Sequence, residues 1–176
     1  MAMNEPENKT KEQRYRIKQD FLKQLIGGVL VVVTNVDQAI VAETYGARGV
    51  IVMNYRVLLA TNRDQVSRGT DPVVLKSIMS AVHLPVIGRA RLGHITEARI
   101  MQSCGVSAIE ESPEVGVAHN NYIEKHPFNV PIISYADNLD SALQRISEGA
   151  TMIASRSNSN INVGGSTADH VPDVYI

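Results

Sequence analysis

Residues 27–33 read Gly-Gly-Val-Leu-Val-Val-Val, a glycine pair followed by an unbroken run of apolar, mostly β-branched side chains. Such a run is typical of a strand that is buried on both faces, as strands of parallel sheets are. Immediately before it, Ile17, Phe21 and Leu25 recur every four residues, which indicates a helix with one apolar face. Glycine commonly stands just past a helix end. The stretch therefore predicts a helix over residues 10–26 followed by a buried strand.

A helix ended by glycine and followed by a strand recurs along the chain. Three times an alanine stands seven residues before a glycine, in the pairs Ala39 and Gly46, Ala98 and Gly105, and Ala142 and Gly149. Short strands are expected at residues 29–33, 50–53, 85–88, 108–109, 131–134 and 152–154, and helices are expected to begin near Asn35, Asp71, Thr96 and Asn138. About six strands alternating with helices predict an α/β protein with a parallel sheet and right-handed crossovers. The pattern alone leaves both a barrel and an open, doubly wound sheet in play.

Composition narrows the class of protein further. The chain has 176 residues, 44% of them hydrophobic, and a net charge of -1. This length suits one domain, whereas a complete eight-unit βα barrel takes about 250 residues. We expect a disordered leader over residues 1–12, a barrel-type domain over 13–156 and a polar tail over 157–176.

The same numbers exclude several partners and compartments. Near-neutral charge argues against nucleic acid or a membrane surface as a partner, and no apolar stretch is long enough to span a bilayer. The single cysteine, Cys104, fits a reducing compartment, so we expect a cytoplasmic protein. The histidines show no metal-ligand spacing, and no metal site is expected.

Several motifs, in their order and spacing, point to one family. Residues 85–94 read Pro-Val-Ile-Gly-Arg-Ala-Arg-Leu-Gly-His, and a Glu-Ser pair follows at residues 111–112. With Gly27-Gly28-Val29, Asp71-Pro72 and Glu148-Gly149-Ala150, these segments resemble the synthase subunit of the glutamine-dependent pyridoxal 5'-phosphate synthase, the Snz/PdxS family. The resemblance covers residues 16–156.

This resemblance implies a (β/α)8 barrel of TIM type, here truncated to about six βα units with an N-terminal helix. It also implies ring-shaped assemblies and a glutaminase partner that supplies ammonia. The family activity that it implies builds pyridoxal 5'-phosphate, the active form of vitamin B6, from ribose 5-phosphate, glyceraldehyde 3-phosphate and ammonia. Those steps pass through intermediates bound to lysine as imines (Schiff bases).

The resemblance places the family's catalytic positions at Val32, Arg89, Glu110 and Arg156. Both imine-forming lysines correspond to arginine here, at Arg89 and Arg156. An imine needs a neutral primary amine, whereas a guanidinium stays protonated and delocalised. An acidic residue of the family corresponds to the apolar Val32, and a second one corresponds to Glu110, which is one methylene longer. We therefore expect no catalytic residues at these positions and no cofactor.

Two functions follow from these substitutions. The first is a non-catalytic relative, or pseudoenzyme, that assembles with itself or with an active synthase subunit as a homo- or hetero-oligomer. The alternative is an active lyase of pyridoxal 5'-phosphate biosynthesis, or another phosphosugar-binding barrel enzyme.

The roles of the remaining polar residues stay open at this point. Arg89, Arg91, His94 and Arg156 are candidates for a residual anion-binding site at the barrel mouth. Alternatively, the first two arginines pair with Glu110 and Glu111 inside the barrel, and the histidine hydrogen-bonds the backbone at a helix N-terminus.

The N-terminal helix also has two interpretations. It contacts the glutaminase subunit, as the resemblance implies, or it caps the bottom of the barrel with its apolar face. A six-stranded parallel sheet leaves two open edges, and parallel sheets are seldom left exposed. We expect the N-terminal helix, the tail or another subunit to cover them.

Overall fold

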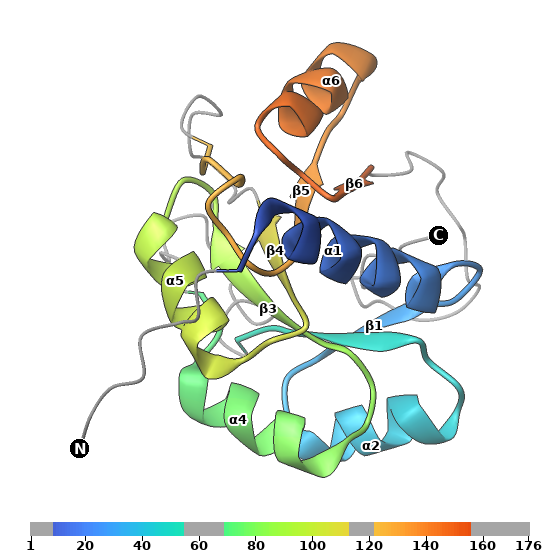
Figure 1. Ribbon diagram of the computed structural model, residues 1–176. Helices are drawn as coiled ribbons and strands as arrows, with labels where there is room; N and C mark the ends of the chain where they lie inside the picture. Colours follow the sequence, from blue (N-terminus) through green and yellow to red (C-terminus); the bar gives the residue numbers. More distant parts are fainter. Residues whose placement is uncertain (1–8, 55–68, 113–121, 156–176) are drawn as a thin grey trace.

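A computed structural model of the chain describes residues 9–54, 69–112 and 122–155 (Figure 1). Its strands form one six-stranded sheet. They are β1 (Leu30–Val33), β2 (Gly49–Val52), β3 (Val86–Arg91), β4 (Ala108–Ser112), β5 (Ile132–Tyr135) and β6 (Met152–Ala154). The helices are α1 (Lys11–Leu25), α2 (Val36–Thr44), α4 (Pro72–Ala81), α5 (Ile95–Cys104) and α6 (Leu139–Ser147). Among these elements no helix has both the length and the apolar character needed to cross a membrane.

The order of the strands decides the type of α/β fold. Strand order in the sheet is β1-β2-β3-β4-β5-β6, the same as in the chain, and every neighbouring pair is parallel. A doubly wound sheet reverses its strand order at a switch point, whereas a βα barrel adds each strand beside the last. The described units therefore follow the course of a (β/α)8 barrel. The predicted fold class, with six strands, is confirmed.

Capping residues mark the beginnings and ends of the helices. The side chains of Asn35, Asp71 and Asn138 each accept a hydrogen bond from the backbone at the start of α2, α4 and α6. Such caps satisfy N–H groups that have no partner inside the helix. Gly105 has a φ of 86°, a left-handed conformation that glycine adopts readily at the end of α5. The predicted helix starts and glycine stops are confirmed to within two residues.

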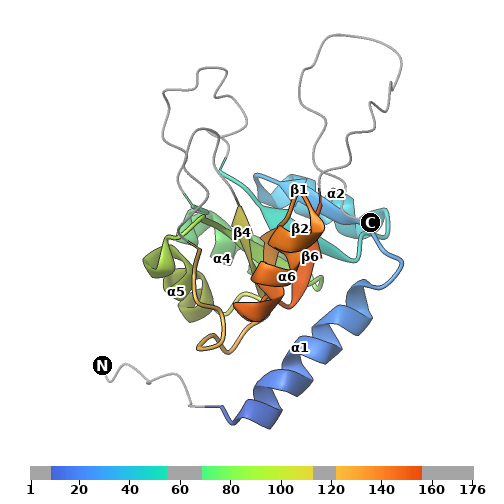
Figure 2. The ribbon, with the colours of Figure 1, turned by 90° about the horizontal axis from the view of Figure 1, so that it is seen from above.

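The two faces of the sheet have separate apolar cores. On the outer face, buried side chains of α2, α4 and α5 such as Ala39, Leu75 and Met101 pack with Val50 and other residues of the strands. The opposite, inner face packs against α1 through Phe21 and Leu25, which share a core with Leu30, Ile51 and Ile87. The long α1 thus lies on the opposite side of the strands from α2 and α4 (Figure 1), and Figure 2 shows its full length beside the sheet. The N-terminal helix thus covers part of the inner face, whereas a cap at the bottom of the barrel and a cover for an open sheet edge stay predictions.

Two strands are longer than the apolar pattern predicts, and the difference places charged residues inside the sheet. β3 extends to Arg91 and β4 extends to Ser112, beyond the expected ends at residues 88 and 109. The extensions contain Arg89, Glu110 and Glu111, whose side chains are satisfied by ion pairs within the fold. A pattern based on hydrophobicity ends a strand at its first charged residue, so it places these three residues beyond the strand ends.

Candidate functional site

An ion pair lies on the inner face of the sheet, between β3 and β4. Arg89 and Glu110 are register partners in the two strands, and Nε of the arginine donates to a carboxylate oxygen of the glutamate. The Glu110 side chain is fully buried, and that of Arg89 is 14% exposed. Neighbouring positions on parallel strands bring the two side chains together. The expected pairing of Arg89 with Glu110 is confirmed.

Tyr135, at the end of β5, completes this group. Its hydroxyl donates to Oε1 of Glu110 over 3.3 Å, and the residue is 7% exposed. Ile133 is the register partner of Glu110. Tyr135 therefore occupies the next inner-facing position toward the carboxyl end of the strand, because side chains alternate between the faces. We call Arg89, Glu110 and Tyr135 the inner cluster.

Thr70 holds the backbone of the inner cluster in place. Its hydroxyl donates to the Val52 carbonyl over 2.6 Å and accepts from the Arg89 backbone N–H over 2.8 Å. Its own backbone N–H donates to the Arg89 carbonyl over 2.9 Å. The residue thereby joins the ends of β2 and β3, beyond the last register pair between Val52 and Gly88. Nothing in the sequence marked this role, since Thr70 stands in a polar stretch.

Val32, another position that the resemblance assigns to catalysis, lies on β1 and packs against the inner core that contains Phe21 and Ile51. It is partly buried and offers only methyl groups to its surroundings. It carries neither a charge nor a hydrogen-bond acceptor on its side chain. The structure therefore places an apolar surface where the resemblance expects an acidic group.

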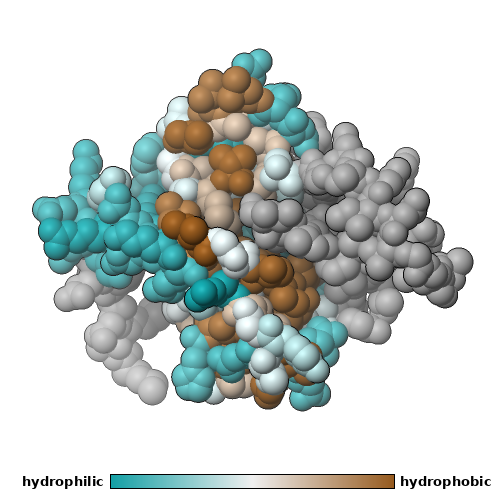
Figure 3. All heavy atoms as spheres, turned by 90° about the vertical axis from the view of Figure 1, so that its right-hand side faces the viewer, coloured by the Kyte–Doolittle hydropathy of each residue, from teal (hydrophilic) through white to brown (hydrophobic). Residues whose placement is uncertain are grey.

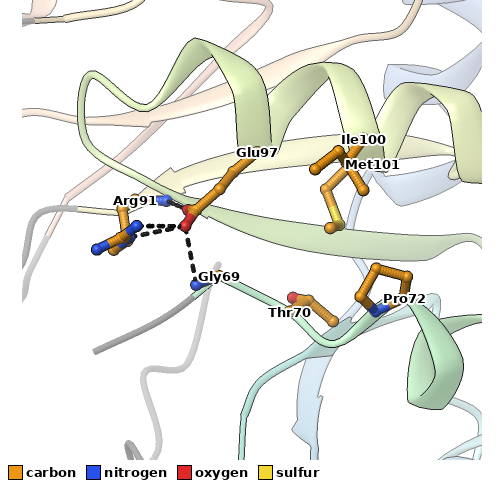
Figure 4. A pocket seen from close by; sticks show the side chains of 7 residues that line it. All are labelled: Gly69, Thr70, Pro72, Arg91, Glu97, Ile100 and Met101. Atoms are coloured by element: carbon orange, nitrogen blue, oxygen red, sulfur yellow. Dashed lines mark hydrogen bonds and ion pairs between the residues drawn. The ribbon is translucent and has the colours of Figure 1, made fainter. Parts of the chain in front are cut away.

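Arg91 has a different partner from the one expected. Its Nη2 lies 2.7 Å from Oε1 of Glu97 on α5, and its backbone N–H donates to Oε2 of the same carboxylate over 3.0 Å (Figure 4). The predicted pairing of Arg91 with Glu110 or Glu111 is wrong. Arg91 is the last residue of β3, and the first turn of α5 folds back over the strand end and brings Glu97 within reach.

The Arg91–Glu97 pair borders a pocket of about 540 Å³. Its lining consists of Gly69, Thr70, Pro72, Arg91, Glu97, Ile100 and Met101. Burial by itself would raise the pKa of the Glu97 carboxyl, but the hydrogen bonds and the charge of Arg91 outweigh it and lower that pKa below its ordinary value. Glu97 is therefore held as a carboxylate, and the pocket wall carries a neutralised pair.

Glu111 points away from the inner cluster and organises the connection from β4 to β5. It accepts hydrogen bonds from the backbone N–H groups of Gly93 and Ile123 and from the Ser134 hydroxyl. Its Oε2 also lies 3.0 Å from Nζ of Lys125, and both side chains are fully buried. The expected pairing of Glu111 with an arginine is wrong, because its partner is Lys125, from the segment that connects β4 and β5.

Lys125 is bound on all sides. Besides Glu111, its Nζ contacts Oε2 of Glu148 at 2.8 Å and donates to the Ile123 carbonyl over 2.8 Å. An ammonium group has three N–H donors, so these acceptors satisfy it completely. Glu148 also pairs with the buried Arg145, whose guanidinium stacks on the ring of Tyr122. We call Glu111, Lys125, Glu148 and Arg145 the outer cluster. Lys125 lies in the connection between β4 and β5, outside any helix or strand, and no sequence motif indicated this network.

The remaining candidate residues are separate from both clusters. His94 is the exposed N-cap residue of α5, and its side chain makes no cap hydrogen bond. The expected side-chain bond to the helix backbone is therefore wrong, although the position at the helix start is confirmed. Arg156 lies outside the described residues. Within residues 9–54, 69–112 and 122–155, no three His, Cys, Asp or Glu side chains gather as metal ligands would.

All six lysines lie in the described residues, and none belongs to a strand. Besides Lys125, the one that stands out is Lys18 on α1. Burial, and secondarily the positive charge of Arg14, lower the pKa of its ammonium group. It lies three residues before Phe21, on the side of α1 that packs toward the sheet.

The amino-acid sequence has close relatives of known name. The chain is 42% identical over 158 residues to a pyridoxal 5'-phosphate synthase subunit PdxS from Nocardia farcinica, covering 88% of this chain and 51% of that protein. It is 39% identical over 160 residues to the pyridoxal 5'-phosphate synthase subunit SNZERR from Suberites domuncula, covering 88% and 52%. The chain spans about half the length of the curated relatives it matches.

A distant structural likeness concerns the fold alone. The crystal structure of a phosphonopyruvate hydrolase complex superimposes with a TM-score of 0.59 at 14% identity, covering 86% of this chain and 65% of the hydrolase. The sequence profile of the SOR/SNZ family matches residues 14–173. That match contains every strand of the sheet and both clusters. The chain therefore belongs to the SOR/SNZ family.

Proposed function

We propose that this chain is a non-catalytic relative of the pyridoxal 5'-phosphate synthase subunits and acts by assembling with further copies of itself or with an active synthase subunit. Its role in vitamin B6 biosynthesis is then regulatory or structural. The relatives at about 40% identity are named as synthase subunits, which supports a role in the same pathway. The residues of the inner cluster support the loss of catalysis.

The Arg89–Glu110 pair is the observation that carries this proposal. The resemblance puts an imine-forming lysine at position 89, where this chain has a guanidinium bound to a buried carboxylate. Carbonyl capture requires a lone pair on a neutral nitrogen. Arginine remains charged throughout the pH range of proteins, and Glu110 stabilises that charge further.

The positions of the lysines support the same conclusion. Lys125 is surrounded by acceptors in the outer cluster, and the other lysines stand on α1, on α4 or just before α1. Lys18 alone combines partial burial with a lowered pKa. It is therefore the lysine on which an unexpected adduct would be sought first.

Exposed apolar side chains support the assembly part of the proposal. Leu139, Leu143 and Ile146 on α6 are 72%, 55% and 55% exposed, and their spacing puts them on one stripe of the helix. Hydrophobic atoms gather at the height of α6 on the face shown in Figure 3. Contiguous apolar surface of this kind is typical of interaction sites.

Two further expectations belong to this proposal. We place the protein in the cytoplasm, where a lone free cysteine such as Cys104 stays reduced. Contact between α1 and a glutaminase subunit remains a prediction. Exposed side chains of this helix, Tyr15 among them, are accessible to such a partner.

Borohydride trapping tests the loss of catalysis. The purified chain is incubated with ribose 5-phosphate, reduced with borohydride and examined by mass spectrometry, beside an active family member as the positive control. We expect no mass increase that saturates with sugar concentration. A saturable adduct on one lysine, or formation of pyridoxal 5'-phosphate by this chain alone, would favour the active lyase instead.

Co-purification tests the assembly. We expect the chain to form oligomers alone or to co-elute with a full-length synthase subunit in size-exclusion chromatography. Leu143→Lys on α6 should weaken this association, whereas Val73→Lys, at a more exposed apolar position on α4, serves as the control. A strictly monomeric chain, both alone and beside the synthase subunit, would contradict the proposal.

A further inference from the structure

We propose that Tyr135 is a second, independent obstacle to the ancestral chemistry: its ring covers the Arg89–Glu110 pair from the carboxyl end of the sheet and keeps sugar phosphates away from it. This inference rests on the proposed function and deepens it, because it explains access to the site rather than the missing amine. It assigns Tyr135 a role that the arginine substitutions alone do not imply.

The register of the strands places Tyr135 on the carboxyl side of the Arg89–Glu110 pair. Arg89, Glu110 and Ile133 lie side by side on β3, β4 and β5. Tyr135 is two residues beyond Ile133 on the same face, and its register partner on β6 is Ala154. In βα barrels, substrates enter at the carboxyl ends of the strands. A molecule arriving from there meets the tyrosine before it meets the ion pair.

Tyr135 is also held in place by burial and by a hydrogen bond. The Tyr135 hydroxyl donates to Oε1 of Glu110 over 3.3 Å, so the side chain points toward the carboxylate instead of into solvent. Tyr135 itself is 7% exposed and belongs to the inner apolar core with Ile133 and Ala154. Glu110 is 0% exposed beneath it. Tyr135 and Arg89 thus both contact the carboxylate of Glu110, one from β5 and one from β3.

A lysine at position 89 would therefore be insufficient for imine formation. Its neutral nitrogen must attack the aldehyde carbon of an open-chain sugar phosphate, and the resulting carbinolamine loses water to form the imine. Both steps need room for the sugar beside Glu110, where the aromatic ring lies. The neighbour Ala154 is small, so removal of the ring should leave an open space above the pair.

The experiment compares four full-length variants in the borohydride assay with ribose 5-phosphate. The assay is run at about pH 8 and at about pH 9.4, because the ordinary lysine pKa is about 10.4 and the neutral amine is more abundant at the higher pH. They are Arg89→Lys, Arg89→Lys/Tyr135→Ala, Arg89→Lys/Tyr135→Phe and Tyr135→Ala. Adducts are located by peptide mass spectrometry. Circular dichroism and thermal unfolding establish that each variant is folded before it is assayed.

We expect a saturable adduct on position 89 only in Arg89→Lys/Tyr135→Ala, at a rate at least tenfold above that of Arg89→Lys. The phenylalanine variant keeps the ring and loses only the hydroxyl, so it should remain unreactive. Equal labelling of Arg89→Lys and the alanine double variant would overturn the role of Tyr135, as would a folded double variant that stays unlabelled. Labelling of the unmodified chain would instead overturn the proposed function, so the two failures are distinguishable.

Discussion

Glu110 and Glu111 are neighbours on β4 and both are fully buried, yet they belong to opposite faces of the sheet and to different kinds of environment. Glu110 pairs with an arginine from the adjacent strand and with a tyrosine from the next one. Glu111 pairs with Lys125 from the connection between β4 and β5, and it accepts two backbone N–H groups as well. One carboxylate contacts side chains of the neighbouring strands, and the other holds the connection between β4 and β5 in place.

The difference shows how the surroundings of a buried charge indicate its role. The outer cluster binds a loop, a strand and the end of α6 to one another, so its loss should affect folding. The inner cluster joins side chains of strands that are already paired through their backbones. Its loss should cost less stability and should change access to the site instead.

The largest effect is expected from Lys125→Met. Removal of the ammonium group leaves Glu111 buried beside an apolar side chain, and breaking such a pair typically costs about 3–5 kcal/mol. Urea unfolding followed by circular dichroism measures the loss. Lys76→Met, at an exposed position of α4, is the matched control and should change stability by less than about 0.5 kcal/mol. An equally small loss in Lys125→Met would show that the outer cluster is dispensable.

Glu110→Gln should have a smaller effect, on the order of 2 kcal/mol, the value of a hydrogen bond to a charged group. Arg89 keeps an amide acceptor and retains partial access to solvent, since its side chain is 14% exposed. The same unfolding experiment measures the difference. A loss as large as that of Lys125→Met would contradict the distinction between the two clusters.

Tyr135→Phe tests the hydroxyl of the inner cluster alone. It removes one hydrogen bond to Glu110 and keeps the ring, so the free energy of unfolding should fall by about 1 kcal/mol. Tyr45→Phe, at an 86% exposed position at the end of α2, is the control for the chemical change itself. No difference between the two variants would mean that the 3.3 Å contact contributes nothing to stability.

The smallest effect concerns the partly exposed pair of Arg91 and Glu97, and it depends on pH. The folded pKa of Glu97 is lowered from its ordinary value of 4.5, so the pair stabilises the fold above that pH and loses its contribution as the pH falls through the lowered pKa. Glu97→Gln should therefore be less stable than the unmodified chain by about 0.5 kcal/mol at neutral pH. The difference should shrink below pH 4.5. A gap that stays constant down to acid unfolding would assign the effect to packing.

The apolar spacing and the helix caps allowed most of the fold to be predicted. The cap residues Asn35, Asp71 and Asn138 and the stop at Gly105 act through bonds and torsions within a few residues, so the sequence alone reveals them. The pairing of Arg89 with Glu110 was also predictable, because the two residues follow corresponding apolar runs of successive strands. These are local or nearest-strand relations.

The contacts of Arg91, Glu111 and Lys125 were not predictable in the same way. Each depends on how a loop or a helix returns over the sheet, and several partners at similar sequence distance compete for the same charge. Tyr135 did carry a signal, since it stands two residues after Ile133 and shares its face. Its meaning required knowledge that the ring lies over Glu110.

The amino-acid sequence by itself determined the alternation of helices and strands and the family to which the chain belongs, because both depend on residue identity and short-range order. Only the tertiary structure decided that the strands lie in chain order, that Glu110 and Glu111 face opposite sides, and that the Tyr135 hydroxyl donates to Glu110. Such relations join residues distant in sequence, and they exist only once the backbone hydrogen bonds of neighbouring strands have set the register.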